Sequence, residues 1–309
     1  LGDVYKRQGL SIRKLMSLSL DLAERDLKMT TFTGSWIREA HRHDAAVEGT
    51  LVNESRTGFS SNRANPGFIL SERAADERRG RVWGFNLVYS GNHMSCVSAD
   101  PRGTVRVMSG ISPDRFEWRL GTGESFETPE AVMCFSAEGL GGMSRAMHDF
   151  VNRHIVRGPW AGRGRPVLVN AWEGFMFDFD ARRLLSVARR AKAMGAELFV
   201  MDDGWFVGRD DDTGGLGDYE PDAKKLPEGV SGLAREVKKL GLGFGIWVEP
   251  EAVSPKSRLY AAHPDWAITE PGREPVYGRN ELLLDLTRGE VRDYIVDSVT
   301  RLLDSAEIS

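Results

Sequence analysis

The sequence predicts a multi-domain α/β protein, in which an N-terminal antiparallel β-sandwich precedes the first half of a (β/α)8 TIM barrel. Residues 30–138 consist of short alternating runs separated by Gly, Pro, Asn and Ser, which is typical of a sandwich. From residue 165 the pattern changes to strand followed by helix, three times over. Each of these strands ends in carboxylates and tryptophans, as the carboxyl edge of a barrel would.

The sandwich is expected over residues 1–138. Its clearest alternating runs are GTLVNES, RVWGFNLVYSG, TVRVMSGI and FEWRLGTGESFETPEAVMCFS. Residues 139–164 are expected to link the two domains through an amphipathic helix and a hinge, GPWAGRGRP, at 158–166. The apolar face predicted for that helix comprises Met143, Met147, Phe150, Val151 and Ile155.

Residues 165–309 are expected to hold three βα units. The apolar strands PVLVNAWEG, ELFVMDDGW and GFGIWVEPE indicate a parallel sheet that is buried on both faces. Gly195 and Gly241 are predicted to end the first two helices, and Thr287 with Glu290 forms an expected capping box for the third. The buried faces predicted for the first and third helices are Leu184, Leu185, Ala188, Ala191 and Met194, and Val291, Ile295, Val299 and Leu302.

Both ends of the sequence suggest a truncated chain. The segment 1–8, LGDVYKRQ, starts without Met and fits poorly with the residues after it, so we interpret it as a non-native scar. The other end, RLLDSAEIS, stops without a helix cap or a polar tail. Because a whole barrel takes about 200 to 250 residues, we expect the chain to stop before the fourth strand.

Composition excludes several classes of protein. The chain of 309 residues is 41% hydrophobic and 28% charged, which is enough for two cores. Its net charge of -4 argues against nucleic acid or an anionic membrane as a partner, and no apolar run approaches the roughly 18 residues of a membrane span. Cys96 and Cys134 have no CxxC spacing, so we expect free thiols and a reducing, cytoplasmic compartment.

The strand ends carry the candidate site. Asp202 and Asp203 come directly after the second strand, although two adjacent carboxylates repel each other and add no stability there. Carboxylates beside aromatic rings suit a sugar, whose apolar face packs on an indole and whose hydroxyls donate to the oxygens. The tryptophans in question are Trp172, Trp205 and Trp247. Core packing of the tryptophans and capping of the next helix by the aspartates remain alternatives.

Other acidic and metal-binding patterns are weaker. Glu249 and Glu251 are candidate carboxyl groups for glycoside cleavage, with orientation of neighbouring groups as the alternative. The run RDDDTGGLGD at 209–218 lacks EF-hand spacing and is interpreted as an exposed acidic loop. His41 and His43, in a predicted loop, lack zinc spacing. We therefore expect no metal and no cofactor.

Several motifs resemble the α-galactosidases of glycoside hydrolase family 36, of the bacterial melibiase type. These are NAWEG…FDFD, ELFVMDDGWF, RDDDTGGLGDY, KLPEGVSGLA, GFGIWVEPEAVSP and GRNELLLDLT, which occur in this order between residues 165 and 309. The front half resembles the N-terminal β-supersandwich of that family more loosely, through GSWIREAHRH, SRTGFSSNRANPGF and GFNLVYSGNH.

The resemblance implies roles for individual residues. Asp202 and Asp203 would bind the galactose hydroxyls far from the anomeric carbon, and Trp172 and Trp247 would form walls of the galactose pocket. Arg279 would contact the sugar, although from its sequence context alone it could equally form a surface ion pair. Glu281 stands where the family has a glutamine.

The resemblance also implies an activity for the full-length protein. It would be a retaining α-galactosidase acting on terminal α-D-galactosyl residues of oligosaccharides such as melibiose or raffinose, and it would form a homotetramer in which the loop 56–66 helps to close a neighbour's pocket. The family's nucleophile motif, KWDxN, and its acid/base aspartate are not found, so the catalytic residues are expected beyond Ser309 and this fragment is expected to be inactive. Alternatives are a non-catalytic carbohydrate-binding or structural fragment, and an α-N-acetylgalactosaminidase or galactosyl-transferring relative.

Overall fold

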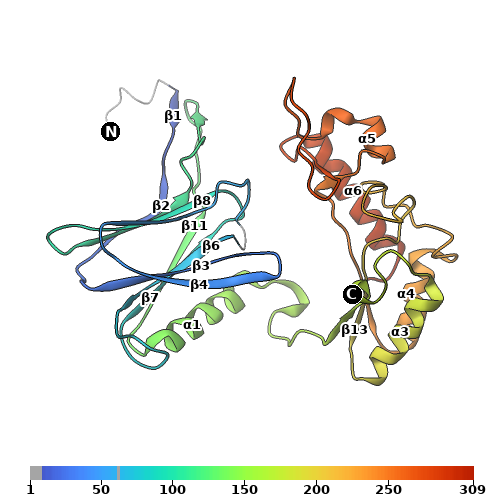
Figure 1. The fold of residues 1–309 in the computed structure, drawn as a ribbon, viewed down its shortest axis with the longest axis horizontal. Helices are drawn as coiled ribbons and strands as arrows, with labels where there is room; N and C mark the ends of the chain where they lie inside the picture. The colour runs from blue at the N-terminus through green and yellow to red at the C-terminus, as the bar shows by residue number, and fades with distance from the viewer. Residues whose placement is uncertain (1–8, 61–62) are drawn as a thin grey trace. The chain divides into compact units, whose positions relative to one another are not determined.

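The computed structural model describes residues 9–60 and 63–309. These residues form two compact units, and the boundary along the chain follows Arg163. The division lies within the glycine-rich segment 158–166. The interpretation of residues 1–8 as a scar, and residues 61 and 62 of the segment 56–66, lie outside the described residues. The prediction that 56–66 is a loop is wrong at its end, because residues 64–66 already belong to strand β6 (Ala64–Glu72). Each unit has its own sheets and its own buried core (Figure 1).

The first unit contains two antiparallel sheets, in agreement with the predicted sandwich. The four-stranded sheet has the order β2-β9-β8-β5 and the five-stranded sheet the order β11-β7-β6-β3-β4, while β1 pairs with β10. The strands are β1 (Leu10–Ile12), β2 (Met16–Leu22), β3 (Leu27–Ser35), β4 (Arg38–Ala46), β5 (Thr50–Glu54), β6 (Ala64–Glu72), β7 (Val82–Val88), β8 (His93–Ala99), β9 (Val105–Ile111), β10 (Trp118–Leu120) and β11 (Glu130–Ser136).

The core of this unit is made by alternate side chains of the two sheets. Phe68 of β6 and Phe85 of β7 are paired across the strands and stack with their ring centroids 4.7 Å apart. Val97 and Val107, from the other sheet, belong to the same buried cluster. Because side chains alternate between the faces of a strand, the alternating runs of the sequence bury one face.

The prediction that His41 and His43 lie in a loop is wrong. Both belong to β4, where they pair with Thr33 and Thr31 of β3. Strand β4 is an edge strand and nearly all of its residues are exposed, so its sequence carries no apolar alternation from which a strand could be predicted.

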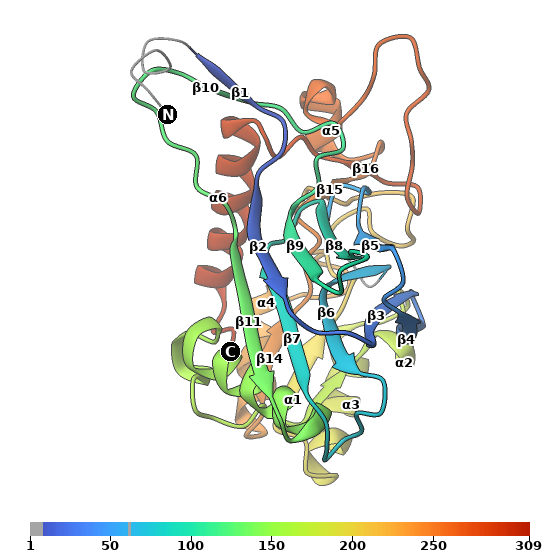
Figure 2. The same cartoon turned by 90° about the vertical axis from the view of Figure 1, so that its left-hand side faces the viewer.

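Helix α1 (Gly139–Phe150) packs on β7 and β11 through the buried Met143 and Met147 (Figure 2). A Cβ on Gly84 of β7 would lie 2.5 Å from the Met143 sulfur, so this glycine lets the helix approach the sheet. The predicted apolar face is wrong beyond Phe150, because the chain widens there into the π-helical turn η2 (Val151–Ile155). Val151 and Ile155 are consequently exposed. A short 3-10 turn, η3 (Gly158–Trp160), comes next.

The second unit is built on three parallel strands in the order β12-β13-β14, as the βα pattern predicts. Two further strands, β15 and β16, form a short antiparallel pair. The strands are β12 (Leu168–Asn170), β13 (Leu198–Met201), β14 (Gly243–Ile246), β15 (Ala252–Val253) and β16 (Leu282–Leu283). The helices are α2 (Trp172–Phe175), α3 (Ala181–Ala193), α4 (Gly229–Lys239), α5 (Arg258–Ala262), the 3-10 turn η4 (Pro264–Trp266) and α6 (Gly289–Ser305). None of the helices among the described residues is long and apolar enough to cross a membrane.

Helix α3 has its predicted pattern except at its last residue. Asp180 caps it by accepting the Arg183 amide at 2.7 Å, and Leu184 is fully buried. Helix α3 ends at Gly195, which has φ +92°, and helix α4 ends at Gly241, which has φ +75°. Both helices therefore end at left-handed glycines, as expected. Met194, predicted to be buried, is 84% exposed because it lies at the C-cap, where the helical face ends.

Two other expectations about this unit are wrong. Val167 and Leu168 are exposed rather than buried, because β12 lies at an edge of the three-stranded sheet. The capping box is absent: the Thr287 amide and hydroxyl both donate to Asp285, and Glu290 accepts from Arg288. Helix α6 therefore begins at Gly289 without a side-chain cap.

Leu184→Ala should lower the free energy of unfolding by about 2 to 5 kcal/mol, because it leaves a cavity between α3 and the sheet. Met194→Ala, at the exposed end of the same helix, is the matched control and should change it by less than about 0.5 kcal/mol. Urea denaturation followed by circular dichroism measures both. Equal losses in the two variants would contradict the assignment of the buried face.

Candidate functional site

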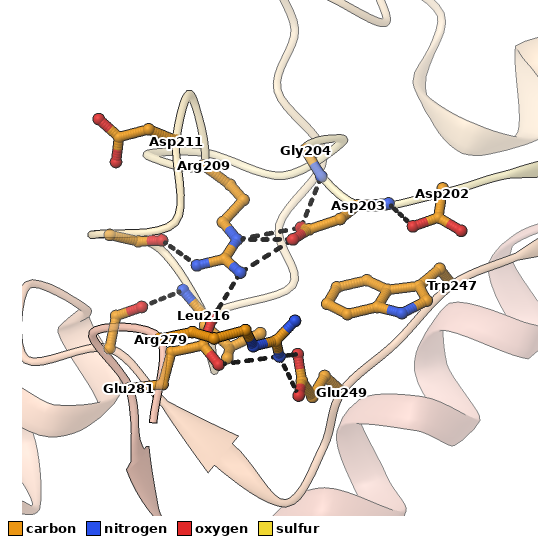
Figure 3. A network of polar contacts seen from close by, with 12 residues as sticks. Asp202, Asp203, Gly204, Arg209, Asp211, Leu216, Trp247, Glu249, Arg279 and Glu281 are labelled. Atoms are coloured by element: carbon orange, nitrogen blue, oxygen red, sulfur yellow. Dashed lines mark hydrogen bonds and ion pairs between the residues drawn. The ribbon is translucent and has the colours of Figure 1, made fainter. Parts of the chain in front are cut away.

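The two aspartates after β13 point in different directions (Figure 3). Asp203 is buried, with 5% of its surface exposed, whereas Asp202 is only half-buried. The Asp202 carboxylate accepts the Asp203 amide at 2.8 Å and the Asn170 side-chain amide at 2.5 Å. The chain turns directly after Asp203 at Gly204, which has φ +96°, and an added Cβ at this position would lie 3.1 Å from the Phe177 ring.

Asp203 is held by an arginine that sequence reasoning missed. The side chain of Arg209 is 1% exposed, which corrects the prediction of an exposed loop at 209–218. Its Nε lies 3.0 and 3.1 Å from the two carboxylate oxygens of Asp203, and its Nη2 donates to Oδ2 at 2.8 Å. Nη1 donates to the Gly214 carbonyl at 3.2 Å. In the sequence, Arg209 is followed by three aspartates, so the segment is predicted to be an exposed acidic loop and its one buried cation is overlooked.

The same guanidinium reaches a second carboxylate. Arg209 Nη2 donates to Glu281 Oε1 at 2.7 Å, although the two residues are 72 positions apart. Glu281 is also buried, and its other oxygen accepts Arg279 Nη2 at 3.1 Å. Arg279 in turn donates to both oxygens of Glu249. A chain of alternating charges therefore links the end of β13 to the segment before β16.

Arg279 is presented by a tight turn. Arg279 and Asn280 have φ +51° and +68°, and the backbones of Gly278 and Glu281 exchange hydrogen bonds of 3.0 and 2.9 Å. Two consecutive left-handed residues are the conformation of a type I′ turn. The side chain of Arg279 is 63% exposed, so it forms the ion pair expected as one alternative while its guanidinium stays accessible to solvent.

The tryptophans divide into one core residue and two half-exposed ones. Trp205 is fully buried, which corrects its interpretation as a sugar platform: its indole donates to the Trp247 carbonyl at 2.9 Å and packs on Phe206. Trp247 is half-buried directly after β14 and lies in the same view as Asp202 and Arg279 (Figure 3). Trp172 is half-buried against Phe177, with the ring centroids 5.1 Å apart.

Asn170 connects Trp172 to the aspartates. Its side-chain oxygen accepts the Trp172 amide at 2.7 Å, while its side-chain nitrogen donates to Asp202. The structure therefore brings Asp202, Asp203, Trp247 and Arg279 together and reaches Trp172 through a single intervening residue. The signal for this link in the sequence is a polar asparagine at the end of an otherwise apolar strand.

Glu249 and Glu251 do not act as a pair. Strand β14 ends at Ile246, so the two residues lie in the turn after it rather than on one side of an extended strand. Glu251 is exposed, whereas Glu249 is half-buried and bonded to Arg279. Burial, together with the negative charge of Glu281, raises the pKa of the Glu249 carboxyl, and the Arg279 guanidinium only partly opposes this.

The remaining acidic residues give no metal site. In the segment 210–213, Asp210 pairs with Lys225 at 2.9 Å, and Asp211 accepts the Thr213 amide and hydroxyl. Across residues 9–60 and 63–309, no three His, Cys, Asp or Glu side chains are placed to hold a metal ion. The half-exposed Asp202, Trp247 and Arg279 together offer hydrogen-bond acceptors, a flat apolar surface and hydrogen-bond donors, which suits a neutral polyhydroxylated ligand.

Comparison with known proteins identifies relatives along nearly the whole chain. The melibiase family model matches residues 125–309, and the model of the glycosyl hydrolase family 36 N-terminal domain matches residues 5–121. α-Galactosidase AgaA of Geobacillus stearothermophilus is 45% identical over 301 residues, and α-galactosidase C of Emericella nidulans is 42% identical over 312 residues. Each alignment covers 97% of this chain but only 41% and 42% of the relative.

A solved structure shows the same fold. The crystal structure of an AgaA variant in complex with stachyose superimposes with a TM-score of 0.94 at 44% identity, over 98% of this chain and 42% of that chain. This chain therefore spans about two fifths of the length of the proteins that it matches.

Glu249→Gln should change how stability depends on pH. The folded chain binds the Glu249 proton more tightly than the unfolded chain does, because the pKa is raised on folding. The stability that this proton contributes is present at acidic pH and is lost as the pH rises through the raised pKa. The melting temperature of the variant relative to the wild type should therefore rise as the pH increases above the ordinary glutamate pKa of about 4.3.

Glu274→Gln, at an exposed glutamate of the same unit that is not among the groups acting on Glu249, is the matched control. A constant difference between Glu249→Gln and the wild type over the whole pH range would contradict the raised pKa.

Proposed function

The chain belongs to glycoside hydrolase family 36, and on that premise we propose that it carries the galactose-binding part of a retaining α-galactosidase. The observation that carries this proposal is the convergence of Asp202, Trp247 and Arg279 beside the carboxyl ends of β13 and β14 (Figure 3). In parallel α/β folds, this edge is where ligands bind.

The proposed architecture is a β-supersandwich over 1–138, a linker over 139–164, and the first three βα units of a (β/α)8 barrel over 165–309. Strands β12, β13 and β14 lie side by side in chain order, as consecutive barrel strands do. After α6 the chain returns to the edge of β14, where the Ser309 amide donates to the Phe244 carbonyl at 2.8 Å. A further strand could add to the sheet at this edge.

We assign the sugar contacts from the geometry of each side chain. The half-exposed Asp202 can accept hydrogen bonds from galactose hydroxyls, with Asp203 behind it. The indoles of Trp247 and Trp172 can pack on the apolar face of the ring. Arg279 is the accessible donor at the same site. All of these contacts concern the hydroxyls and the ring, and none requires a metal or a cofactor.

The proposed reaction of the whole protein is hydrolysis of terminal α-D-galactosyl residues from oligosaccharides such as melibiose or raffinose. One carboxylate attacks the anomeric carbon and displaces the leaving oxygen, which takes a proton from a second carboxyl group. Water, deprotonated by that second group, then releases galactose from the covalent intermediate with retention. We assign neither catalytic role to a residue of this chain, because the KWDxN nucleophile motif and the acid/base aspartate of the family are not found among its residues.

The location and assembly of the protein are parts of the same proposal. Cys96 and Cys134 are free thiols, which supports a reducing, cytoplasmic compartment. We propose a homo-oligomer, with the tetramer as the expected state, in which the segment 56–66 of one subunit helps to close the pocket of another.

Extending the reading frame past Ser309 in the source DNA and assaying the product on an aryl α-galactoside tests the proposed activity. Hydrolysis with a new carboxylate after the next strand is expected, whereas the 309-residue chain alone should show no turnover. A stop codon directly after Ser309 would favour a non-catalytic carbohydrate-binding role. Galactose binding by the chain, seen as a change in tryptophan fluorescence that glucose does not produce, tests the sugar site separately.

Asp202→Asn should weaken galactose binding by about 10-fold or more, because it replaces a charged acceptor with a neutral one of the same shape. Asp211→Asn, an exposed aspartate of the same unit, is the control and should bind as the wild type does. Titration of both variants with galactose measures the effect. Equal affinity of Asp202→Asn and the wild type would remove Asp202 from the proposed site.

A further inference from the structure

We infer that Arg209 is a positioning residue, whose buried guanidinium holds Asp203 and, through Glu281, the turn that presents Arg279, and so sets the geometry of the sugar site. This inference rests on the proposed function of the same site. Arg209 itself is 1% exposed and does not need to touch a ligand. Its action would pass through the two carboxylates that it binds.

The geometry at Asp203 is over-determined by Arg209. Three of the contacts that the guanidinium makes go to the two oxygens of this one carboxylate, at 2.8 to 3.1 Å. Asp203 also accepts the Gly204 amide at 2.6 Å. A planar guanidinium that meets both oxygens fixes the rotation of the carboxylate, which a lysine, as a point charge, would not do.

The geometry at Arg279 depends on the same cation through one intermediate. Glu281 has one oxygen on Arg209 and the other on Arg279, and it is itself 5% exposed. It also closes the left-handed turn at Arg279 and Asn280 by exchanging backbone hydrogen bonds with Gly278. Displacing the Glu281 carboxylate would therefore move both the charge partner and the backbone of Arg279.

The loop around Arg209 is built to keep it in place. Gly215 has φ +75° and packs on the backbone of Gly208, so the loop returns on itself and its Gly214 carbonyl accepts from the guanidinium. Lys225 donates to the carbonyls of Gly204 and Arg209 at 2.8 and 3.2 Å. The Phe177 ring lies near the guanidinium, with its centroid 5.7 Å from the central carbon. An arginine that only balanced a surface charge would not need these contacts to its loop and to the Phe177 ring.

A cation between two buried carboxylates is not an efficient way to stabilise a fold. Each buried charge carries a desolvation cost, and apolar residues of similar volume often replace buried ion pairs without loss of stability. The network does fix the orientation of the carboxylates, since each charge-assisted hydrogen bond restricts an oxygen to one position. A role in positioning accounts for this arrangement better than a role in stability.

The test combines two readouts on the 309-residue chain carrying Arg209→Lys. The amide resonance of Gly204 reports the Asp203 carboxylate without any ligand, and galactose titration reports the site. We expect the Gly204 amide to shift by many linewidths and galactose affinity to fall by about 10-fold, in a chain that stays folded by circular dichroism. Arg235→Lys, at an exposed arginine paired with Glu228, is the matched control and should change neither.

A double-mutant cycle separates positioning from general loss of structure. If Arg209 acts through Asp203, Arg209→Lys should cost clearly less than about 10-fold in affinity once Asp203→Asn is present, because only the route through Glu281 to Arg279 then remains. Losses that simply multiply in the double variant would overturn the inference. So would an unchanged Gly204 amide in the single variant.

Glu281→Gln keeps the inference testable if Arg209→Lys does not fold. The amide oxygen can still accept from Arg209, while Arg279 loses the charge of Glu281 and keeps only that of Glu249, so galactose affinity should fall with the Gly204 amide unchanged. Unchanged affinity would overturn the link to Arg279. A wild-type chain that binds no galactose would refute the proposed function instead, and the Gly204 resonance in the two variants would still decide whether Arg209 orients Asp203.

Discussion

The guanidinium of Arg209 is the contact on which the candidate site depends. It joins the carboxylate of Asp203, at the end of β13, to the carboxylate of Glu281, just before β16. Without this cation, two buried negative charges would share a low-dielectric interior, where ionising both is costly. The groups that face solvent at the site are arranged around this buried link.

The charge balance of the network explains which groups remain available to a ligand. Two arginines, Arg209 and Arg279, face the three carboxylates of Asp203, Glu281 and Glu249. The buried cation is occupied by its partners, whereas Arg279 is largely exposed and Asp202 accepts from two neutral amides. The accessible polar groups are therefore an acceptor and a donor, with an indole at the same edge. That combination supports the proposed sugar site.

The local patterns of the sequence were reliable where one element decides the outcome. The parallel strands, the caps at Gly195 and Gly241, and the buried face of α3 depend on periodicity and on backbone preferences of single residues. The predictions were wrong where contacts with neighbouring residues determine the local structure. Thr287 satisfies its hydroxyl on Asp285 instead of the helix, and the π-helical turn at Val151 interrupts the apolar face of the linker helix.

The sequence by itself determined that two adjacent aspartates and several tryptophans follow the strands of a parallel α/β unit, because strand ends and residue order are local properties. A role for Arg279 was implied only by the family resemblance. Only the tertiary structure decided which of these aspartates and tryptophans stay exposed to solvent. Trp205 turns into the core while Trp247 stays half-exposed, and Asp203 turns to a buried partner while Asp202 remains accessible. The physical reason is that burial is a property of the whole packed unit. A cation such as Arg209, hidden beside three aspartates in the sequence, acquires its role only when a residue 72 positions away folds onto it.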